Sequence, residues 1–395
     1  MPVVRHRLGA LSLAGLLLVA ALPGVAASPD AMPGSQAGAP GATDGAAPPA
    51  SGHPALNELL RAASSAGDRL SAALTDLAAS AGATAGERST MAYGEDGRLT
   101  ILLLGSDHRE DYKYQEHTDV IMVVSLDPVR GKIAMASIPR STVRFPLHPD
   151  NRTAGGPKTS GDRKINVLYG GYKKGSTDAI EPAALDRLRM DVAHALRLEI
   201  DYYSYIRFTG FDALVDAAGG IRVDIPASIV DPYYQDSGTP PFGIRFSAAT
   251  DRLVKGASAQ RCSGTIKECK RAIVFVRSRK GNVGSVRNSD YQRARRQQAL
   301  IFSAIGKVTS GEADLETLRS GSISHITTDM PRTAADALWL RDQLTGARSP
   351  DKARVVFADP TWATKQTVPK DSTRLHMTDV RAWIAQKMAP VETLP

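Results

Sequence analysis

Apolar residues along this chain fall into short runs that alternate with segments of helical periodicity. Residues 99–104 form a continuous apolar run that ends at Gly105, which predicts a strand buried on both faces. The apolar runs 120–126 and 133–138 flank turn-forming sequence at residues 127–131, which predicts an antiparallel hairpin. We expect these three strands to form the centre of a sheet.

The same pattern of runs continues toward the C-terminus. Helical periodicity is present in residues 182–198, 209–218, 290–308, 334–344 and 378–388. Strand-like runs follow at residues 202–208, 221–225, 273–279 and 353–357. Residues 226–252 are polar and contain several prolines, so we predict a long loop and a candidate lid there. Strands and helices mixed in this way favour an α/β fold, an α/β/α layered domain with a mixed central sheet.

The first 96 residues have a different composition from the rest. Arg5 and Arg7 precede an apolar run and a site of small residues, so residues 1–27 are predicted to be a signal peptide. A short membrane anchor is the alternative, and either one places the protein outside the cytoplasm. The predicted domains are then residues 28–53 as an Ala/Gly/Pro/Ser-rich linker, 54–96 as a helical spacer, 97–310 as the catalytic domain and 311–395 as its α/β continuation.

Charge and cysteine content narrow the choice of partner and compartment. The net charge of +8 predicts an anionic partner, which the sign alone does not identify. A leader would export the protein out of the compartment that contains DNA. The chain also has no recognition-helix motif, so we expect no nucleic-acid partner. Cys262 and Cys269 are the two cysteines of the chain, and an exported protein favours a disulfide between them.

Two acidic residues and an arginine are predicted to meet at one edge of the sheet. If residue 126 pairs with residue 133, Asp119 lies opposite Arg140 to within a residue or two. If the strand 99–104 runs beside 133–138 in the same direction, Asp107 falls at that edge too. Converging carboxylates suit Mg²⁺ or Mn²⁺, which prefer oxygen ligands. The plain structural alternative is that Asp107 caps a turn and Asp119 forms a salt bridge with Arg140.

A second cluster of polar residues lies between residues 273 and 298. Alternation along the predicted strand places on one face the side chains of Phe275, Arg277 and Arg279. Helical spacing places on one face of the next element Asp290, Arg293 and Gln297. Guanidinium groups bind phosphate bidentately and stay charged, so these arginines predict a pyrophosphate pocket. The alternative is a solvated basic face.

The ordered set of motifs resembles the LytR-CpsA-Psr (LCP) family of cell-envelope proteins. The matching stretches are Leu102-Leu103-Leu104-Gly105-Ser106-Asp107-His108-Arg109, Thr118-Asp119-Val120-Ile121-Met122, Ser137-Ile138-Pro139-Arg140, Lys164-Ile165-Asn166, Phe208-Thr209-Gly210-Phe211, Gly219-Gly220-Ile221, Val276-Arg277-Ser278-Arg279, Asp290-Tyr291-Gln292-Arg293 and Arg296-Gln297-Gln298. They occur in family order over roughly residues 98 to 305.

The resemblance implies a phosphotransferase that moves an anionic glycopolymer from a polyprenyl pyrophosphate onto peptidoglycan at the outer face of the cytoplasmic membrane. It implies that Asp107 and Asp119 bind Mg²⁺ or Mn²⁺ and that Arg140 is essential for catalysis. Its pyrophosphate contacts correspond to Arg277, Arg279, Arg293, Gln297 and Arg109. The polyprenyl tail is expected in an apolar tunnel, whose walls are predicted from the helix 182–198 and from Phe211, Leu214 and Val215.

One position departs from the family pattern. Relatives usually carry an aspartate directly after the arginine of the Ser-Ile-Pro-Arg motif, where this chain has Ser141. A serine supplies no ion pair to Arg140 and no carboxylate to a metal. This departure keeps open a non-catalytic binder of lipid pyrophosphates or glycopolymers. A phosphatase that transfers to water and a transcriptional attenuator, a role that an older label of the family suggests, are further alternatives.

Overall fold

The computed structural model describes residues 91–108, 116–153, 156–174, 178–235, 240–253, 267–309, 325–331, 339 and 352–391. The predicted leader and linker, most of the spacer, the helix 334–344 apart from residue 339, and residues Arg109 and Cys262 lie outside these ranges. Within the described residues, no helix is both long and apolar enough to cross a membrane.

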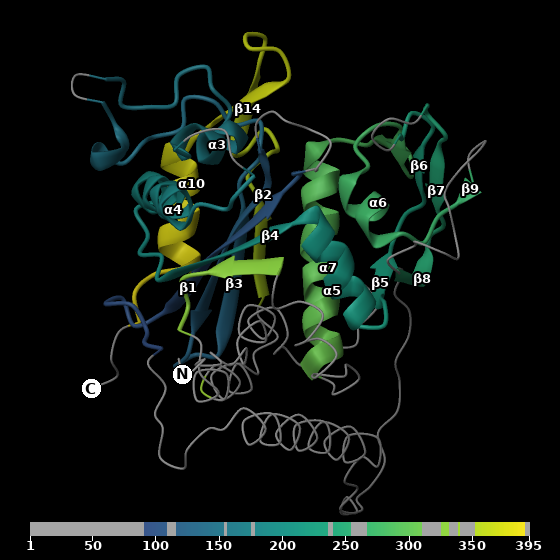
Figure 1. The fold of residues 1–395 in the computed structure, drawn as a ribbon, viewed down its shortest axis with the longest axis horizontal. Coiled ribbons are helices and arrows are strands. Elements are labelled where there is room, and N and C mark those ends of the chain that lie inside the picture. Colours follow the sequence, from purple (N-terminus) through teal and green to yellow (C-terminus); the bar gives the residue numbers. More distant parts are fainter. Residues whose placement is uncertain are drawn as a thin grey trace, which may run out of the picture.

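A six-stranded mixed sheet forms the centre of the protein (Figure 1). Its strands, in spatial order, are β12 (Ile326–Thr328), β4 (Tyr202–Arg207), β1 (Leu99–Ser106), β2 (Thr118–Asp127), β3 (Lys132–Ser137) and β13 (Lys352–Val356). The predicted hairpin is confirmed, with residue 126 opposite residue 133. The predicted neighbours of β1 are wrong, because β2 lies between β1 and β3. Since β2 is antiparallel to both, β1 and β3 still run in the same direction.

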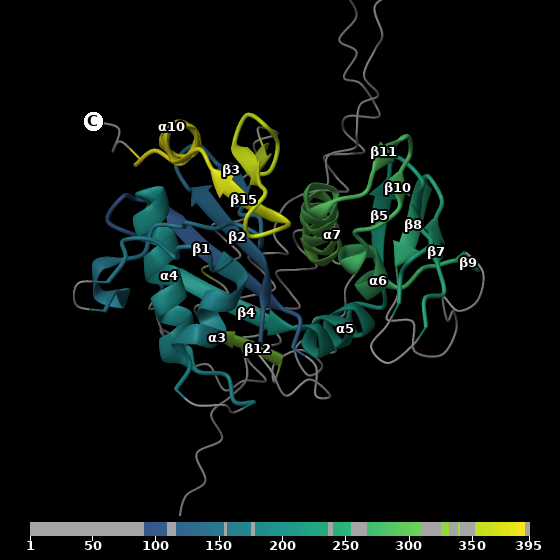
Figure 2. The same cartoon turned by 90° about the horizontal axis from the view of Figure 1, so that it is seen from above.

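Helices cover both faces of this sheet, as Figure 2 shows from above. One face packs against α3 (Leu168–Tyr172), α4 (Pro182–Leu196) and α10 (Met377–Lys387), and two short 3₁₀ turns, Pro149–Asn151 and Ile165–Val167, lie in the loops of that side. The other face packs against α5 (Phe208–Ala217), α6 (Ala272–Arg277) and α7 (Asp290–Thr309). Alternation along β1 explains the two cores, because Ile101 and Leu103 face one and Leu102 and Leu104 face the other. The α/β/α prediction is therefore confirmed.

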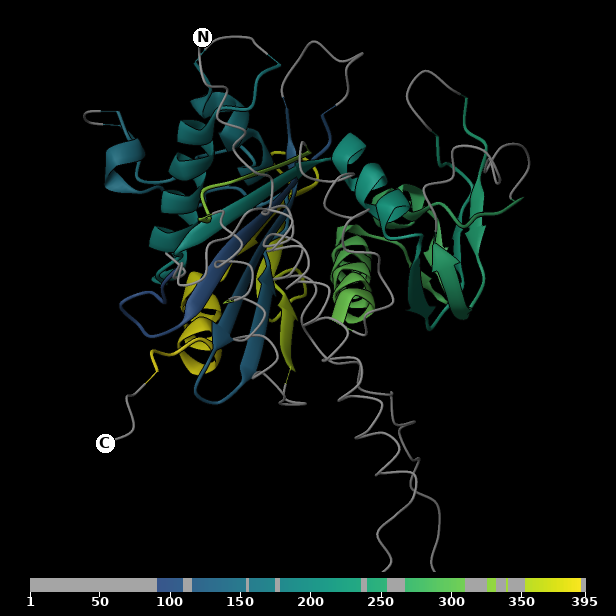
Figure 3. The same ribbon diagram turned by 60° about the horizontal axis from the view of Figure 1, so that its bottom comes forward.

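A smaller β-rich lobe lies beyond α7 (Figure 3). It contains a pair, β5 (Ile221–Ile225) and β8 (Ala249–Leu253), and a second sheet in the order β11 (Val286–Arg287), β10 (Asn282–Val283), β6 (Ile229–Asp231), β7 (Ile244–Phe246) and β9 (Lys267–Glu268). The prediction of a long polar loop over residues 226–252 is therefore wrong. Strands of three residues, such as β6 and β7, carry too little alternation to be recognised from sequence.

The predicted strand over residues 273–279 is also wrong, because residues Ala272–Arg277 form the helix α6. All five residues before Arg277 in this helix are buried. A short apolar run that is buried all round gives no period by which to tell a strand from a helix, and the β-branched residues favoured the wrong choice. Tertiary packing against α7 and the small lobe decides the conformation here.

The C-terminal residues return to the edge of the main sheet. A hairpin of β14 (Ala363–Gln366) and β15 (Ser372–Leu375) precedes α10. Its residue Thr373 bridges to Thr142, just after the loop that follows β3. The hairpin therefore lies against the segment that begins at Arg140.

Candidate active site

Three of the predicted site residues lie at one edge of the central sheet. Asp107 directly follows β1, Asp119 is the second residue of β2, and Arg140 lies three residues after β3. Because β2 is antiparallel to both neighbours, its first residues lie at the edge where β1 and β3 end. The hairpin register thus brings Asp119 and Arg140 together.

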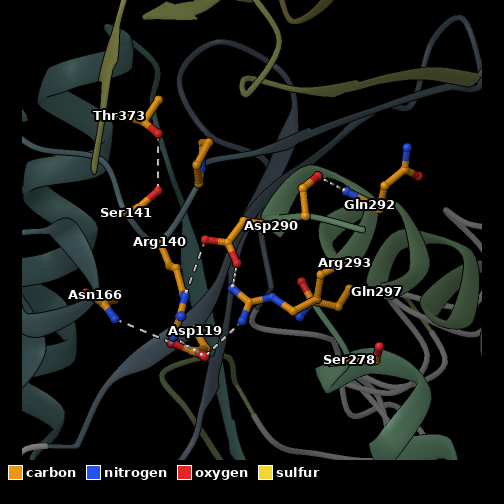
Figure 4. A network of polar contacts seen from close by, with 12 residues as sticks. Asp119, Arg140, Ser141, Asn166, Ser278, Asp290, Gln292, Arg293, Gln297 and Thr373 are labelled. Atoms are coloured by element: carbon orange, nitrogen blue, oxygen red, sulfur yellow. Dashed lines mark hydrogen bonds and ion pairs between the residues drawn. The ribbon is translucent and has the colours of Figure 1, made fainter. Parts of the chain in front are cut away.

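Asp119 is the centre of a buried ionic network (Figure 4). Nη1 of Arg140 donates to both carboxylate oxygens of Asp119, at 2.8 Å each. Nη1 of Arg293 donates to Oδ2 at 3.3 Å, and Nδ2 of Asn166 donates to Oδ1 at 3.4 Å. Burial opposes ionisation of Asp119, but the charges of Arg293 and Arg140 outweigh it and lower the pKa below its ordinary value. Asp119 is therefore a carboxylate at neutral pH.

Asp107 has the opposite electrostatic character. Burial raises its pKa, and the negative charge of Asp119 raises it further. Its Oδ1 accepts a hydrogen bond from the backbone N–H of His117 at 3.2 Å. The two carboxyl groups are therefore close enough to repel each other, and a cation between them would relieve that repulsion.

Asp290 joins Arg140 and Arg293 on the side away from Asp119. Its Oδ2 lies 3.8 Å from Nε of Arg140, and its Oδ1 lies 3.3 Å from Nη2 of Arg293. Sequence reasoning placed Asp290 on the face of the helix that carries Arg293 but did not include it among the site residues. Asn166 is also missing from the predicted site residues, and its only signal in the sequence is the Lys164-Ile165-Asn166 motif.

Three buried polar atoms of this network have no hydrogen-bond partner in the described part of the structure. They are Oδ1 of Asn166, Oδ1 of Asp290 and Nε of Arg293. Burial lowers the pKa of Arg293, although Asp290 and Asp119 act in the opposite direction. Buried polar groups are nearly always paired in proteins, so unpaired atoms grouped around a cationic pocket indicate a place for a polar ligand.

Arg277 and Arg279 do not share one face of a strand, as the sequence had predicted. The guanidinium of Arg277 lies 5.1 Å above the ring centroid of Phe208, a cation–π contact. Arg279 is exposed, two residues after the end of the helix. Arg293, by contrast, forms an ion pair with Asp119 at 3.3 Å.

Arg296 is a buried arginine that fixes the end of α6. It donates from Nε to the carbonyl of Phe275 at 2.8 Å and from Nη1 to Oδ1 of Asn288 at 3.1 Å, and from Nη2 to the carbonyl of Ser278. Burial lowers its pKa to about 9. Arg296 therefore holds the last turn of α6, which carries Arg277, against α7.

An apolar cavity of about 130 Å³ lies between the sheet and the helices α5 and α7. Its walls include Phe211, Leu214, Leu300, Ile301 and Ala304, and its polar lining includes Arg207 and Gln297. Phe211 and Leu214 are thus confirmed as lining residues. Val215 is buried in the core instead, and the predicted wall 182–198 is wrong because α4 covers the opposite face of the sheet.

The oxygen ligands at this site fit a divalent cation that keeps open positions. No cluster of three or more acidic, histidine or cysteine side chains with ligand geometry occurs among the described residues. A cation between Asp107 and Asp119 would therefore take its remaining ligands from water and from phosphate oxygens. Mg²⁺ typically binds in this way, through one or two carboxylates and the substrate.

Cys269 is buried and is a disulfide cysteine. The other predicted partner, Cys262, lies outside the described residues. Arg109 also lies outside them, so its predicted pyrophosphate contact stays a prediction.

Comparison with known proteins adds a family and a fold. The model of the LytR_cpsA_psr family matches residues 70–351. The cell wall biosynthesis protein LcpA of Corynebacterium glutamicum is 27% identical over 247 residues, which cover 54% of this chain and 40% of that protein. The Bacillus subtilis protein TagV, named a polyisoprenyl-teichoic acid–peptidoglycan teichoic acid transferase, is 33% identical over 128 residues, covering 32% of this chain and 28% of that protein. The chain thus matches less than half the length of either relative.

The crystal structure of TagV from B. subtilis has the same fold. It superposes with a TM-score of 0.52 and 21% sequence identity, and the match covers 76% of this chain and 100% of that chain. At this identity the likeness establishes the architecture alone.

Proposed function

Because the chain belongs to the LytR-CpsA-Psr family, we propose that it is a phosphotransferase that attaches an anionic glycopolymer, carried on a polyprenyl pyrophosphate, to peptidoglycan. The named activity of TagV, a teichoic acid transfer to peptidoglycan, supports this class of reaction. The signal peptide or membrane anchor predicted for residues 1–27 supports a location of the protein at the outer face of the cytoplasmic membrane.

One observation carries the proposal: the helix α7 borders both the ionic network and the apolar cavity. Arg293 contacts Asp119, and Gln297, four residues further along α7, lines the cavity. A polyprenyl pyrophosphate has this same combination of an anionic head and an apolar tail. We infer that the tail occupies the cavity and that the pyrophosphate lies against Arg293, with Arg277 near the cavity wall at Phe208.

Asp107 and Asp119 would hold Mg²⁺ or Mn²⁺, and that ion, when bound, offsets the charge that develops on the phosphate oxygens. Two observations support a cationic ligand at this point: the pKa of Asp107 is raised, and the buried Oδ1 of Asn166 accepts no hydrogen bond within the described residues. Asp119 stays ionised through its arginines, so it is available as a ligand over the whole neutral pH range.

The residues of this chain then act mainly by position and charge. Arg140 stays protonated, so it orients the phosphate or the attacking hydroxyl and does not act as a base. A sugar hydroxyl of peptidoglycan attacks the phosphorus that carries the glycopolymer, its proton passes to solvent, and polyprenyl phosphate leaves. Phosphoryl transfer needs positioning and electrostatic stabilisation, so no covalent intermediate on the protein is required.

Transfer of a labelled glycan from a synthetic polyprenyl pyrophosphate to solubilised peptidoglycan tests the proposal. We expect labelled peptidoglycan with the wild-type protein and Mg²⁺, and loss of most of the product with EDTA or with Arg140→Gln. Arg222→Gln, which changes an exposed strand residue of the small lobe, is the matched control. Free glycan phosphate would instead indicate a phosphatase, and tight binding of the donor without turnover would indicate a non-catalytic binder.

A further inference from the structure

We propose that the groove between residues 142–146 and the β14–β15 hairpin is a binding subsite for an acidic glycan. This inference rests on the proposed function and assigns the groove to the glycan strand that meets the donor at Arg140. The chemistry recognised is a carbohydrate chain that carries carboxylate or phosphate groups.

The groove has a volume of about 540 Å³ and lies between the segment that follows Arg140 and the C-terminal hairpin. One wall is Thr142 to Pro146, and the other is formed by β14, β15 and the first residues of α10. None of the described residues that line it carries a carboxylate. Threonine hydroxyls and the amide of Gln366 provide hydrogen-bonding groups of the kind that sugar hydroxyls need.

The groove is physically connected to Arg140 through hydrogen bonds at Thr373. The N–H of Thr373 donates to the carbonyl of Ser141 at 3.0 Å, and the N–H of Val143 donates to the carbonyl of Thr373 at 2.9 Å. The hydroxyls of Ser141 and Thr373 are 3.2 Å apart (Figure 4). Arg144 lies four residues after Arg140, so their Cα atoms are at most about 14 Å apart, a length that a short oligosaccharide spans.

Two arginines give the groove its charge. The side chain of Arg144 is 51% exposed, and its ionic partner Asp162 is 4.0 Å away and itself exposed. Arg374 is exposed on β15. The β14–β15 hairpin also carries Lys365 and Lys370, and its one acidic residue is Asp371. Guanidinium groups bind carboxylate and phosphate through paired hydrogen bonds, so these positions suit an anionic ligand.

The backbone of Arg144 is held in an uncommon conformation. Its φ is 53°, in the left-handed region, and its N–H donates to the carbonyl of Gly161 at 2.7 Å. This conformation costs an arginine about 1 kcal/mol. The surrounding hydrogen bonds therefore hold the Arg144 side chain at the wall of the groove at an energetic cost, which is typical of functional positions.

The position of the groove favours a glycan over the lipid tail of the donor. Its apolar floor, Phe145 and Leu375, belongs to the core on the α4 face of the sheet. The apolar cavity lies on the opposite face, under α5 and α7. Arg140 at the sheet edge lies between them, so a donor with its tail in the cavity leaves the groove open to a polar strand.

Half of the groove lies outside the family match. The matched residues end at 351, whereas β14, β15 and the start of α10 follow that point. The C-terminal wall of the subsite therefore follows the residues that the family model matches.

Direct binding tests the proposal without turnover. We would titrate the full protein with muramidase-solubilised peptidoglycan, with a lipid-free glycan phosphate and with a neutral chitin oligosaccharide, and follow each by calorimetry. The variant Arg144→Asn/Arg374→Gln removes both charges, and asparagine tolerates the left-handed conformation. Arg222→Gln/Arg245→Gln removes two exposed charges from the small lobe as a matched control.

We expect the groove variant to weaken binding of an acidic glycan about tenfold, with no change for the control variant or the neutral glycan. Loss with peptidoglycan supports the acceptor strand as the occupant, and loss with the glycan phosphate alone would overturn the assignment to the acceptor. Equal binding of both acidic glycans by the groove variant and the wild type would overturn the subsite. If wild-type protein shows no transfer but the groove variant still weakens binding, the subsite stands and the proposed function fails.

Discussion

Ser141 and Thr373 are 232 positions apart in the sequence, and their hydroxyl groups lie within hydrogen-bond distance, at 3.2 Å. Ser141 occupies the position where the family resemblance predicts an aspartate beside Arg140. The side chain is instead directed at the C-terminal hairpin, and Arg140 obtains its ion pairs from Asp119 and Asp290. The serine therefore does not leave the arginine without a carboxylate, which removes one reason for a non-catalytic interpretation.

Asp290→Asn is expected to reduce transfer while leaving the fold intact. The change removes the charge that lies 3.8 Å from Arg140 and 3.3 Å from Arg293, so both guanidiniums lose part of their orientation. We expect kcat to fall by about tenfold to a hundredfold, as for other groups that position charge. Asp224→Asn on the exposed face of β5 is the control. Wild-type turnover in Asp290→Asn would remove Asp290 from the site.

The carboxylates of Asp107 and Asp119 should differ in their effect on stability. Asp119→Asn leaves two buried guanidiniums without their shared carboxylate, so the free energy of unfolding should drop by about 3 kcal/mol. Asp107→Asn removes a group whose charged form is already disfavoured by burial, so stability should be unchanged or higher. Urea unfolding in EDTA measures both. Equal losses in the two variants would contradict the electrostatic assignment.

Asp201 makes stability depend on pH. Burial raises its pKa to about 7, and the charges of Glu199 and Asp96 add to the shift. Because the folded state holds this proton more tightly than the unfolded state, stability should decrease as pH rises from about 4 to 7. Asparagine keeps the acceptor for the N–H of Thr100, which lies 2.7 Å from Oδ2.

Asp201→Asn should therefore raise the unfolding free energy at pH 8 by about 1 kcal/mol, a value reduced for partial exposure, and should have little effect near pH 4.5. Urea titrations of both proteins at the two pH values measure the difference. A variant that is less stable than wild type at pH 8 would show that Asp201 is stabilising as a carboxylate.

The apolar cavity predicts selectivity for the lipid. Ala304 lies on α7 in its wall, so Ala304→Phe fills space that a prenyl chain needs. We expect transfer from a long-chain donor to fall at least tenfold, while a donor with a two-isoprene tail is used as before. A parallel loss with both donors would mean that the substitution disturbs the site itself, and equal use of the long-chain donor would place the lipid elsewhere.

Arg296 should contribute both to the stability of the fold and to the position of Arg277 at the end of α6. Arg296→Met keeps the apolar length but leaves the carbonyls of Phe275 and Ser278 without their donor. A loss of about 2 to 3 kcal/mol in unfolding free energy is expected. Gln292→Met on the same helix is a control for the loss of one polar side chain. The KM for the donor should also rise if the end of α6 positions Arg277.

Local pattern was sufficient for much of the fold. The apolar runs identified β1, β2 and β3, and the turn between the latter two fixed a register that placed Asp119 opposite Arg140. Helical spacing placed Asp290, Arg293 and Gln297 on one face of α7. These features follow from periodicity and turn chemistry, which act between residues near in sequence.

Tertiary structure alone decided the rest. The run 272–277 is helical because it is buried all round by α7 and the small lobe, and β2 separates β1 from β3 because of sheet order. The network of Asp119 with Arg293 and the contact of Ser141 with Thr373 join segments far apart in sequence. Such contacts depend on how two hydrophobic cores pack on opposite faces of one sheet, and no local period carries that information.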